Sequence, residues 1–207
     1  NNIQADWVHI GHINEYDLLY LPYPVMLTGE TAKALMRWVE NGGQLVSEGC
    51  PAYFGDGGRV GTIQPNLGLD KVFGTTEDYV EFTPDLLEDL TFTLEEIGSV
   101  RGGLYLQAYR LAGGKATGWY EDGRLAVVDN RYGVGKTRLI GTFPGFGYSR
   151  HPNPSSRAFF ASLLTWAGKV QHIRSSEPRM TARLHAGEGG TYLWVTNPTR
   201  TSLPAQL

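Results

Sequence analysis

The chain has 207 residues, 41% of them hydrophobic and 19% charged, and its net charge is −3. These values indicate an ordinary globular chain with one sizeable core and a small second unit. Lys and Arg do not cluster, which argues against a nucleic-acid partner, and no apolar run approaches the roughly 18 residues of a membrane helix. The single cysteine excludes an internal disulfide and mildly favours the cytoplasm, but localisation otherwise stays open.

The first residues are expected to begin inside a longer protein, because the chain lacks an initial Met and opens on NNIQADWVHIG. Residues Gln4–Ile10 alternate weakly and predict a strand. His9 and His12 lie three positions apart, but only Asp6 and Glu15 stand near them. We therefore predict surface histidines, no metal site and no cofactor.

The next stretch predicts a βαβ unit. Leu18–Leu21 has the length of a buried strand, and Gln44–Glu48 forms a second one. Between them, Thr28 can cap a helix over Gly29–Glu40, whose Ala32, Leu35, Met36 and Val39 share one face. Short joins between strand, helix and strand predict that the two strands are parallel.

Ligand sites in parallel sheets lie at the carboxyl ends of the strands. In this chain those ends are Pro22–Val25 and Gly49–Phe54. The second end runs into a long loop that reaches Asn66, and long loops at this edge often have a function or cover an interface.

The middle of the chain predicts antiparallel structure. Leu67–Gly74 indicates a short helix and Tyr79–Phe82 a strand. From Leu104, four strand-like runs are separated by Gly-Gly, Asp-Gly and Gly-Val-Gly, which predicts hairpins. The last run, Lys136–Phe143, is expected to rejoin the main sheet. Gly133–Thr137 resembles the end of a phosphate-binding loop, but its first glycine is replaced by Asn130, so we predict a hairpin turn.

The last third of the chain predicts a helix and a hairpin. Pro144–Pro154 is expected to be a loop, and Ser155 or Ser156 to cap a helix over Arg157–Ala167. After the linker Arg174–Pro178, a glycine-rich turn joins two alternating runs, Met180–His185 and Thr191–Thr196. They predict the opening hairpin of a second, all-β domain.

Cys50 follows one predicted strand and His151 follows a later one. The catalytic cysteine and histidine of class I glutamine amidotransferases occur in the same order. The chemistry needed by a cysteine nucleophile is incomplete, because Pro51 has no N–H for an oxyanion and Asn153 stands where a carboxylate would orient the histidine. We therefore expect a degenerate site with no catalytic residue. Glu48 and Asp56 are interpreted as a strand-end carboxylate and a turn aspartate rather than a glycosidase pair.

The order of parts resembles the middle and last domains of glycoside hydrolase family 42 β-galactosidases. The resemblance rests on four segments, which are YDLLYLPYPVMLTGETAKALMRWVENGGQLVSEG, LGLDKVFG, YGVGKTRLIGTFPG and TYLWVTNPT. In that family a catalytic barrel precedes an amidotransferase-like trimerisation domain and a small β domain. The resemblance implies that the catalytic glutamates lie in a barrel absent from this chain.

The predicted class is α/β, a flavodoxin-like (class I glutamine amidotransferase-like), mainly parallel sheet with helices on both faces and an antiparallel β insertion. Residues 1–172 would form the amidotransferase-like domain, and residues 173–207 a linker and the first hairpin of a C-terminal β domain. The resemblance implies a non-catalytic oligomerisation domain of a β-galactosidase-like hydrolase. The implied partners of the domain are further copies of itself, in a homo-oligomer such as a trimer, and the missing catalytic barrel.

Two alternatives stay open. The first is a carbohydrate-binding module, since aromatic rings stack on sugars and several aromatics are expected in loops. The second is a Cys-His hydrolase that uses Cys50 and His151. The loop aromatics, which would contact a sugar or an interface, are Tyr53, Phe54, Trp119, Phe146 and Tyr148.

Overall fold

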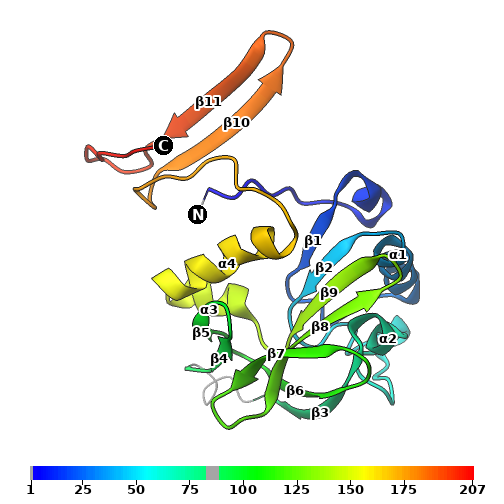
Figure 1. Cartoon of the computed structure of the whole chain (residues 1–207). Helices are drawn as coiled ribbons and strands as arrows, with labels where there is room; N and C mark the ends of the chain where they lie inside the picture. The colour runs from blue at the N-terminus through cyan, green and yellow to red at the C-terminus, as the bar shows by residue number, and fades with distance from the viewer. Residues whose placement is uncertain (1, 83–88) are drawn as a thin grey trace. The chain divides into compact units, whose positions relative to one another are not determined.

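The computed structural model of the chain describes residues 2–82 and 89–207 (Figure 1). Two compact units are present. One is Val8–Ser156, and the other combines the N-terminal residues through Trp7 with Arg157–Leu207. The domain boundary expected between residues 172 and 173 stays a prediction.

The helical elements are η1 (Ile10–Glu15), α1 (Gly29–Glu40), η2 (Asp56–Gly58), α2 (Leu69–Phe73), α3 (Pro144–Arg150) and α4 (Pro154–Trp166). The strands are β1 (Leu18–Leu21), β2 (Gln44–Ser47), β3 (Thr75–Glu81), β4 (Thr91–Leu94), β5 (Gly98–Arg101), β6 (Leu106–Leu111), β7 (Lys115–Tyr120), β8 (Leu125–Tyr132), β9 (Gly135–Ile140), β10 (Thr181–Gly187) and β11 (Gly190–Thr196).

The larger unit is built on a mixed seven-stranded sheet with the order β1-β2-β9-β8-β7-β4-β5. Strands β1, β2 and β9 are parallel, with Leu19 opposite Leu45 and Leu45 opposite Thr137. The other neighbouring strands pair antiparallel. The α/β class, the parallel βαβ unit and the return of β9 to the main sheet are thereby confirmed.

An antiparallel insertion lies between β2 and β9 in the chain, as predicted. One predicted hairpin is wrong, because β6 pairs with β3 in a separate two-stranded sheet rather than with β7. The Gly74 carbonyl accepts hydrogen bonds from the N–H groups of Ala112 (2.8 Å) and Gly114 (2.9 Å). These bonds hold the Gly-Gly segment against the end of α2, so the chain crosses between sheets there.

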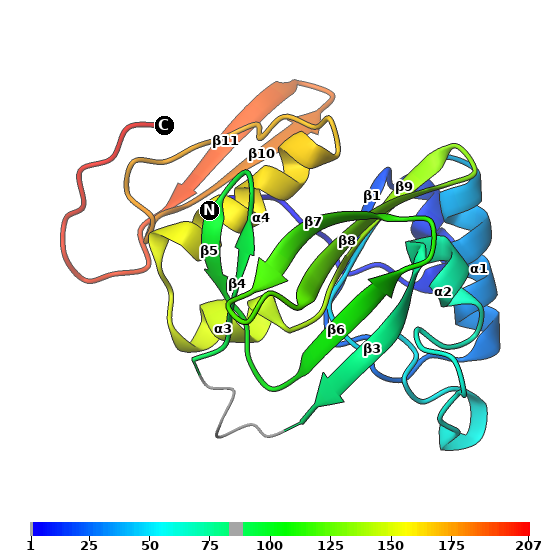
Figure 2. The same ribbon diagram turned by 60° about the horizontal axis from the view of Figure 1, so that its bottom comes forward.

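Helices α1 and α2 lie on the same face of the main sheet (Figure 2). Thr28 caps α1 by accepting a hydrogen bond from the Thr31 N–H (3.2 Å), as predicted. The buried face of α1 contains Trp38 in addition to Ala32, Leu35 and Val39, while Met36 is partly buried at its margin. Together with Leu19, Leu45 and Leu139 of the sheet and the apolar residues of α2, this face forms the core.

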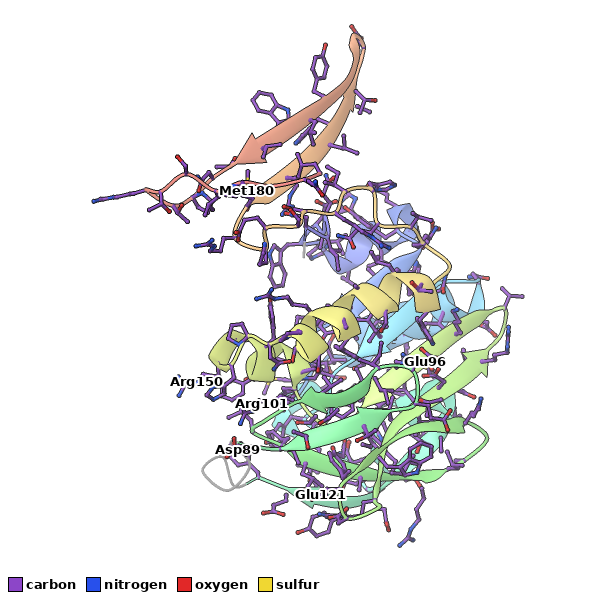
Figure 3. All side chains as sticks on the ribbon, turned by 60° about the vertical axis from the view of Figure 1, so that its left-hand side comes forward. Asp89, Glu96, Arg101, Glu121, Arg150 and Met180 are labelled. Carbon is purple, nitrogen blue, oxygen red and sulfur yellow. The ribbon has the colours of Figure 1, made fainter. Side chains whose placement is uncertain are left out.

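The far edge of the same sheet is polar. Arg101 on β5 forms an ion pair with Asp89, and Figure 3 shows the two side chains next to each other. The Asp89 side chain is 86% exposed, so water screens the pair and we assign it little stability.

The predicted strand over Gln4–Ile10 is wrong. The N-terminal segment contacts the backbone of β10 through side chains and not through its own backbone. The Asn2 side-chain oxygen accepts from the Ala182 N–H (2.9 Å), and the Gln4 side-chain amide exchanges two hydrogen bonds with the Leu184 backbone (3.1 and 3.2 Å). The segment ends in η1, where the His9 ring accepts from the Gly11 N–H (3.2 Å).

The segment predicted as a loop at Pro144–Pro154 contains the helix α3. The cap of α4 also differs from the prediction. Asn153 accepts a hydrogen bond from the Ser156 N–H (2.9 Å), so α4 starts at Pro154, where the fixed φ of proline suits the first helical position. The predicted hairpins at β8–β9 and β10–β11 are both confirmed.

Candidate functional site

The candidate site lies at the carboxyl ends of β1, β2 and β9. Because the three strands are parallel, the residues that follow them meet at one edge of the sheet. The side chains at this edge that bear chemistry are Glu48 and Cys50. Both are fully buried.

The Glu48 carboxylate joins three separate segments. It accepts hydrogen bonds from the Tyr20 hydroxyl (2.7 Å), the Tyr23 N–H (3.0 Å) and the Gly145 N–H (2.7 Å). Burial raises the pKa of the Glu48 carboxyl above its ordinary value, although these hydrogen bonds act in the opposite direction. Glu48 is therefore a clamp between β1, β2 and α3, which agrees with its interpretation as a structural carboxylate.

Asp56 also has a structural contact, since its carboxylate accepts from the Gly29 N–H at the start of α1 (3.1 and 3.2 Å). A carboxylate at this position satisfies a backbone donor that lacks a partner within the helix. The bond ties the long loop after β2 to the helix that precedes β2.

Cys50 occupies a strained position directly after β2. Its φ is +58°, a value uncommon for residues other than glycine. Its N–H donates to the Gln107 side-chain oxygen (2.8 Å), and its carbonyl accepts from the Tyr53 N–H (3.1 Å). Burial raises the pKa of the Cys50 thiol well above its ordinary value, and the nearby Glu77 carboxylate raises it further.

Gln107 organises the buried polar groups around Cys50. Its side-chain oxygen also accepts from the Tyr109 hydroxyl (2.7 Å), and its amide nitrogen donates to Glu77 (2.7 Å). The Gln107 carbonyl accepts from the Tyr120 hydroxyl (3.1 Å). Sequence reasoning missed this residue; the available signal was a glutamine inside the apolar strand pattern LYLQAYRL.

His151 and Cys50 differ in their burial. His151 follows α3 and is exposed, whereas Cys50 is completely buried. Asn153 donates to the His151 carbonyl (3.0 Å) and caps α4, so its side chain is used in local structure. A fully buried thiol whose pKa is raised is poorly suited to form a thiolate nucleophile.

The loop aromatics come from three separate segments of the chain. Tyr53 and Phe54 contact each other edge to face (5.5 Å between centroids), while Phe146 and Tyr148 lie on α3 and Trp119 on β7. A continuous aromatic stack instead joins residues that the sequence reasoning did not single out. Tyr23 stacks on Phe143 (4.4 Å), Tyr105 meets Phe143 edge to face (5.5 Å), and Phe82 stacks on Tyr105 (4.5 Å).

The His12 side chain pairs with a carboxylate in η1. His12 contacts Glu15 (2.9 Å), and residues 2–82 and 89–207 hold no group of three side chains suited to bind a metal ion. Over the same residues, every helix is too short or too polar to span a bilayer. A hollow of about 710 Å³ in the smaller unit, near Arg157, Lys169 and Arg174, is lined by none of the candidate site residues.

The chain is thus an α/β domain with Glu48 and Cys50 buried at the carboxyl edge of its parallel strands. Residues 1–169 match the family model of the β-galactosidase trimerisation domain. The chain belongs to this family. No curated protein matched its sequence.

Solved structures show the same fold. A β-galactosidase from Bacillus circulans sp. alkalophilus is similar with a TM-score of 0.79 and 18% identity, over 95% of this chain and 29% of that one. A catalytic mutant of Gan42B, a GH42 β-galactosidase from G. stearothermophilus, has a TM-score of 0.76 and 19% identity, over 95% and 28%. A cytoplasmic protein from Salmonella typhimurium has a TM-score of 0.54 and 15% identity, over 78% and 76%. The chain thus spans less than a third of the β-galactosidases that it resembles.

Proposed function

We propose that this chain holds together copies of a β-galactosidase-like protein and contributes no catalytic residue. The observation that carries the proposal is the match to the trimerisation domain family over residues 1–169. The site geometry supports it, because Cys50 is buried, Pro51 offers no N–H, and Glu48 is committed to three donors. Any galactosidase activity would belong to a catalytic barrel elsewhere in the parent protein.

Sedimentation of the purified chain tests this function. Over a micromolar concentration range we expect a reversible equilibrium between monomer and a closed oligomer, with a trimer as the proposed form. A chain that stays monomeric at every concentration would remove the proposal. In parallel, hydrolysis of a nitrophenyl galactoside by the chain alone should not exceed the buffer rate.

We further propose that the fold is related to the amidotransferase-like, flavodoxin-type class. An amidotransferase-like, flavodoxin-type origin is supported by the parallel strands β1, β2 and β9 and by Cys50, which follows β2 at a positive φ, as a nucleophile on a strained strand-end turn would. The origin predicts helices on both faces of the sheet. A crystal structure with one uncovered face would contradict it.

The carbohydrate-binding alternative remains a prediction that no feature of the site favours. The loop aromatics come from three segments, since Phe146 and Tyr148 lie on α3, Trp119 lies on β7, and Tyr53 and Phe54 follow β2, whereas stacking on a sugar ring needs aromatic faces in one place. The Cys-His hydrolase alternative is opposed by the exposed position of His151 and the burial of Cys50.

A further inference from the structure

Three segments at the carboxyl edge form one surface, here called the loop patch. It consists of residues 21–28, 49–55 and 60–69. Backbone bridges join them in order, since Met26 pairs with Phe54 and Phe54 pairs with Val60. The loop patch can be followed in Figure 2 from the loop after β1 to the cyan segment between β2 and α2.

The three segments of the loop patch contain no Asp, Glu, Lys or Arg, although 19% of the chain is charged; the exposed Asp56 and Arg59 lie in the turn that joins the second segment to the third. It also exposes large apolar side chains, which are Tyr23 (49%), Met26 (67%), Val60 (52%) and Ile63 (56%). Depletion of charge together with exposed Met and aromatic residues is the composition of the core of a protein–protein interface.

Hydrogen bonds fix the backbone of the loop patch. Ala52 N–H donates to the Pro24 carbonyl (2.8 Å) and Phe54 N–H to the Val25 carbonyl (2.9 Å), while the Leu27 N–H donates to the Phe54 carbonyl (3.2 Å). The Gln64 side chain donates to the Tyr53 carbonyl (3.2 Å). A surface that is already ordered loses little conformational entropy on binding, so it is suited to docking.

Three polar side chains of the loop patch form hydrogen bonds within it or at its borders. Gln64 bonds to Tyr53, the Asn66 oxygen accepts from the Leu67 N–H (2.7 Å), and Thr28 caps α1. A sugar site instead needs polar groups that converge on the ligand together with an enclosing hollow. The loop patch therefore favours a protein surface as its occupant.

We propose that the loop patch is one side of the interface between copies of this chain, and that it docks on a different surface of the neighbouring copy. The inference rests on the proposed oligomerisation function and specifies its contact surface. A ring of three copies requires contacts between two unlike surfaces, because a self-complementary surface closes a dimer. The occupant is a second copy of this chain.

Met26→Lys and Ile63→Lys test the loop patch. Both side chains are more than half exposed in the single chain, so the substitutions should be tolerated in the monomer, but an ammonium group would be buried without a partner in the assembly. We expect sedimentation to show dissociation constants raised at least about tenfold. Met26→Leu, which keeps the apolar character, should assemble like the wild type.

Val134→Lys is the matched control. Val134 is 75% exposed and lies in the turn between β8 and β9, near the opposite ends of the parallel strands. It should leave the dissociation constant unchanged. Circular dichroism and thermal melts of all four variants verify folding.

The outcomes separate the two proposals. If the wild type assembles and both lysine variants in the loop patch assemble equally well, the loop patch assignment is wrong and the oligomerisation function stands. If the lysine variants assemble normally but lose retention on immobilised galactoside, a sugar occupies the loop patch and the assignment is likewise wrong. A monomeric wild type removes both proposals.

Discussion

The two ends of the parallel strands β1, β2 and β9 differ in their surface chemistry. The amino ends lie next to charged residues, which are Glu15, Asp17, Glu40, Arg131 and Lys136. The carboxyl ends lead into the three segments of the loop patch, which have no charged residue, and Glu48 and Cys50 are fully buried at this edge. The carboxyl edge is where such sheets usually place ligands. In this protein the edge keeps a fixed backbone and a buried polar network, while its outer surface has the composition of an interface.

Among the glycines of the chain, Gly141 has the least room for a side chain. A Cβ there would lie 1.9 Å from the Gln107 carbonyl oxygen and 2.6 Å from the Tyr120 hydroxyl. Because the nearer atom belongs to the backbone, Gly141→Ala should lower the free energy of unfolding by about 3 kcal/mol in urea denaturation. Gly11→Ala, whose Cβ meets only the His9 ring at 3.4 Å or more, should change it little. Equal losses of unfolding free energy for the two variants would contradict the close approach of the Gln107 carbonyl to Gly141.

Glu48→Gln tests the clamp. One Glu48 oxygen accepts from Tyr20 and Gly145 and the other from Tyr23, so a glutamine would direct its amide N–H₂ at the Tyr23 N–H. We expect a loss of about 1–3 kcal/mol, measured by urea denaturation near neutral pH. Glu40→Gln, an exposed carboxylate at the amino edge, should cost less than about 0.5 kcal/mol.

The stability of the wild type and that of Glu48→Gln should depend differently on pH. The folded pKa of Glu48 is raised above the unfolded value of about 4.3, so the folded state binds the proton more tightly. Its stabilising contribution is present below the unfolded pKa and is lost as pH rises through the folded pKa. The difference in free energy of unfolding between the wild type and Glu48→Gln should therefore narrow as pH rises from the unfolded pKa of Glu48 through its folded pKa. A difference that widens would show that the folded pKa is lowered instead.

The alkylation rate of Cys50 measures how accessible its thiol is to solvent at the carboxyl edge. Burial and the raised thiol pKa should make reaction with iodoacetamide at pH 8 much slower in the folded chain than in denaturant, since each unit of raised pKa lowers the thiolate fraction about tenfold. Cys50→Ser controls for reaction at other groups. A folded-state rate with a midpoint below about pH 7 would revive the hydrolase hypothesis.

The smallest expected effect is that of His151→Ala. The side chain is exposed, so the free energy of unfolding should change by less than about 0.5 kcal/mol. The alkylation rate of Cys50 should also stay the same in this variant. A clear change in that rate would mean that the imidazole acts on the thiol, and the interpretation of the carboxyl edge as a structural site would fail.

Sequence alone determined the local elements whose signals are strong. The Thr28 cap, the α1 periodicity, the parallel βαβ unit and the two hairpins follow from short-range patterns that tertiary contacts reinforce. The sequence also predicts that Cys50 is not a nucleophile, because Pro51 and Asn153 lack the needed groups whatever the fold.

The tertiary structure decided which distant residues meet. Gln107 reaches Cys50 across 57 positions and Gly145 reaches Glu48 across 97, and no local pattern encodes such pairings. The same holds for β6, which pairs with β3 because Gly74 holds the Gly-Gly segment, and for the loop patch, whose three segments are joined only by the Met26–Phe54–Val60 bridges. Periodicity reports the face that a residue occupies within its own element, whereas the partner across that face is fixed by the packing of the whole sheet.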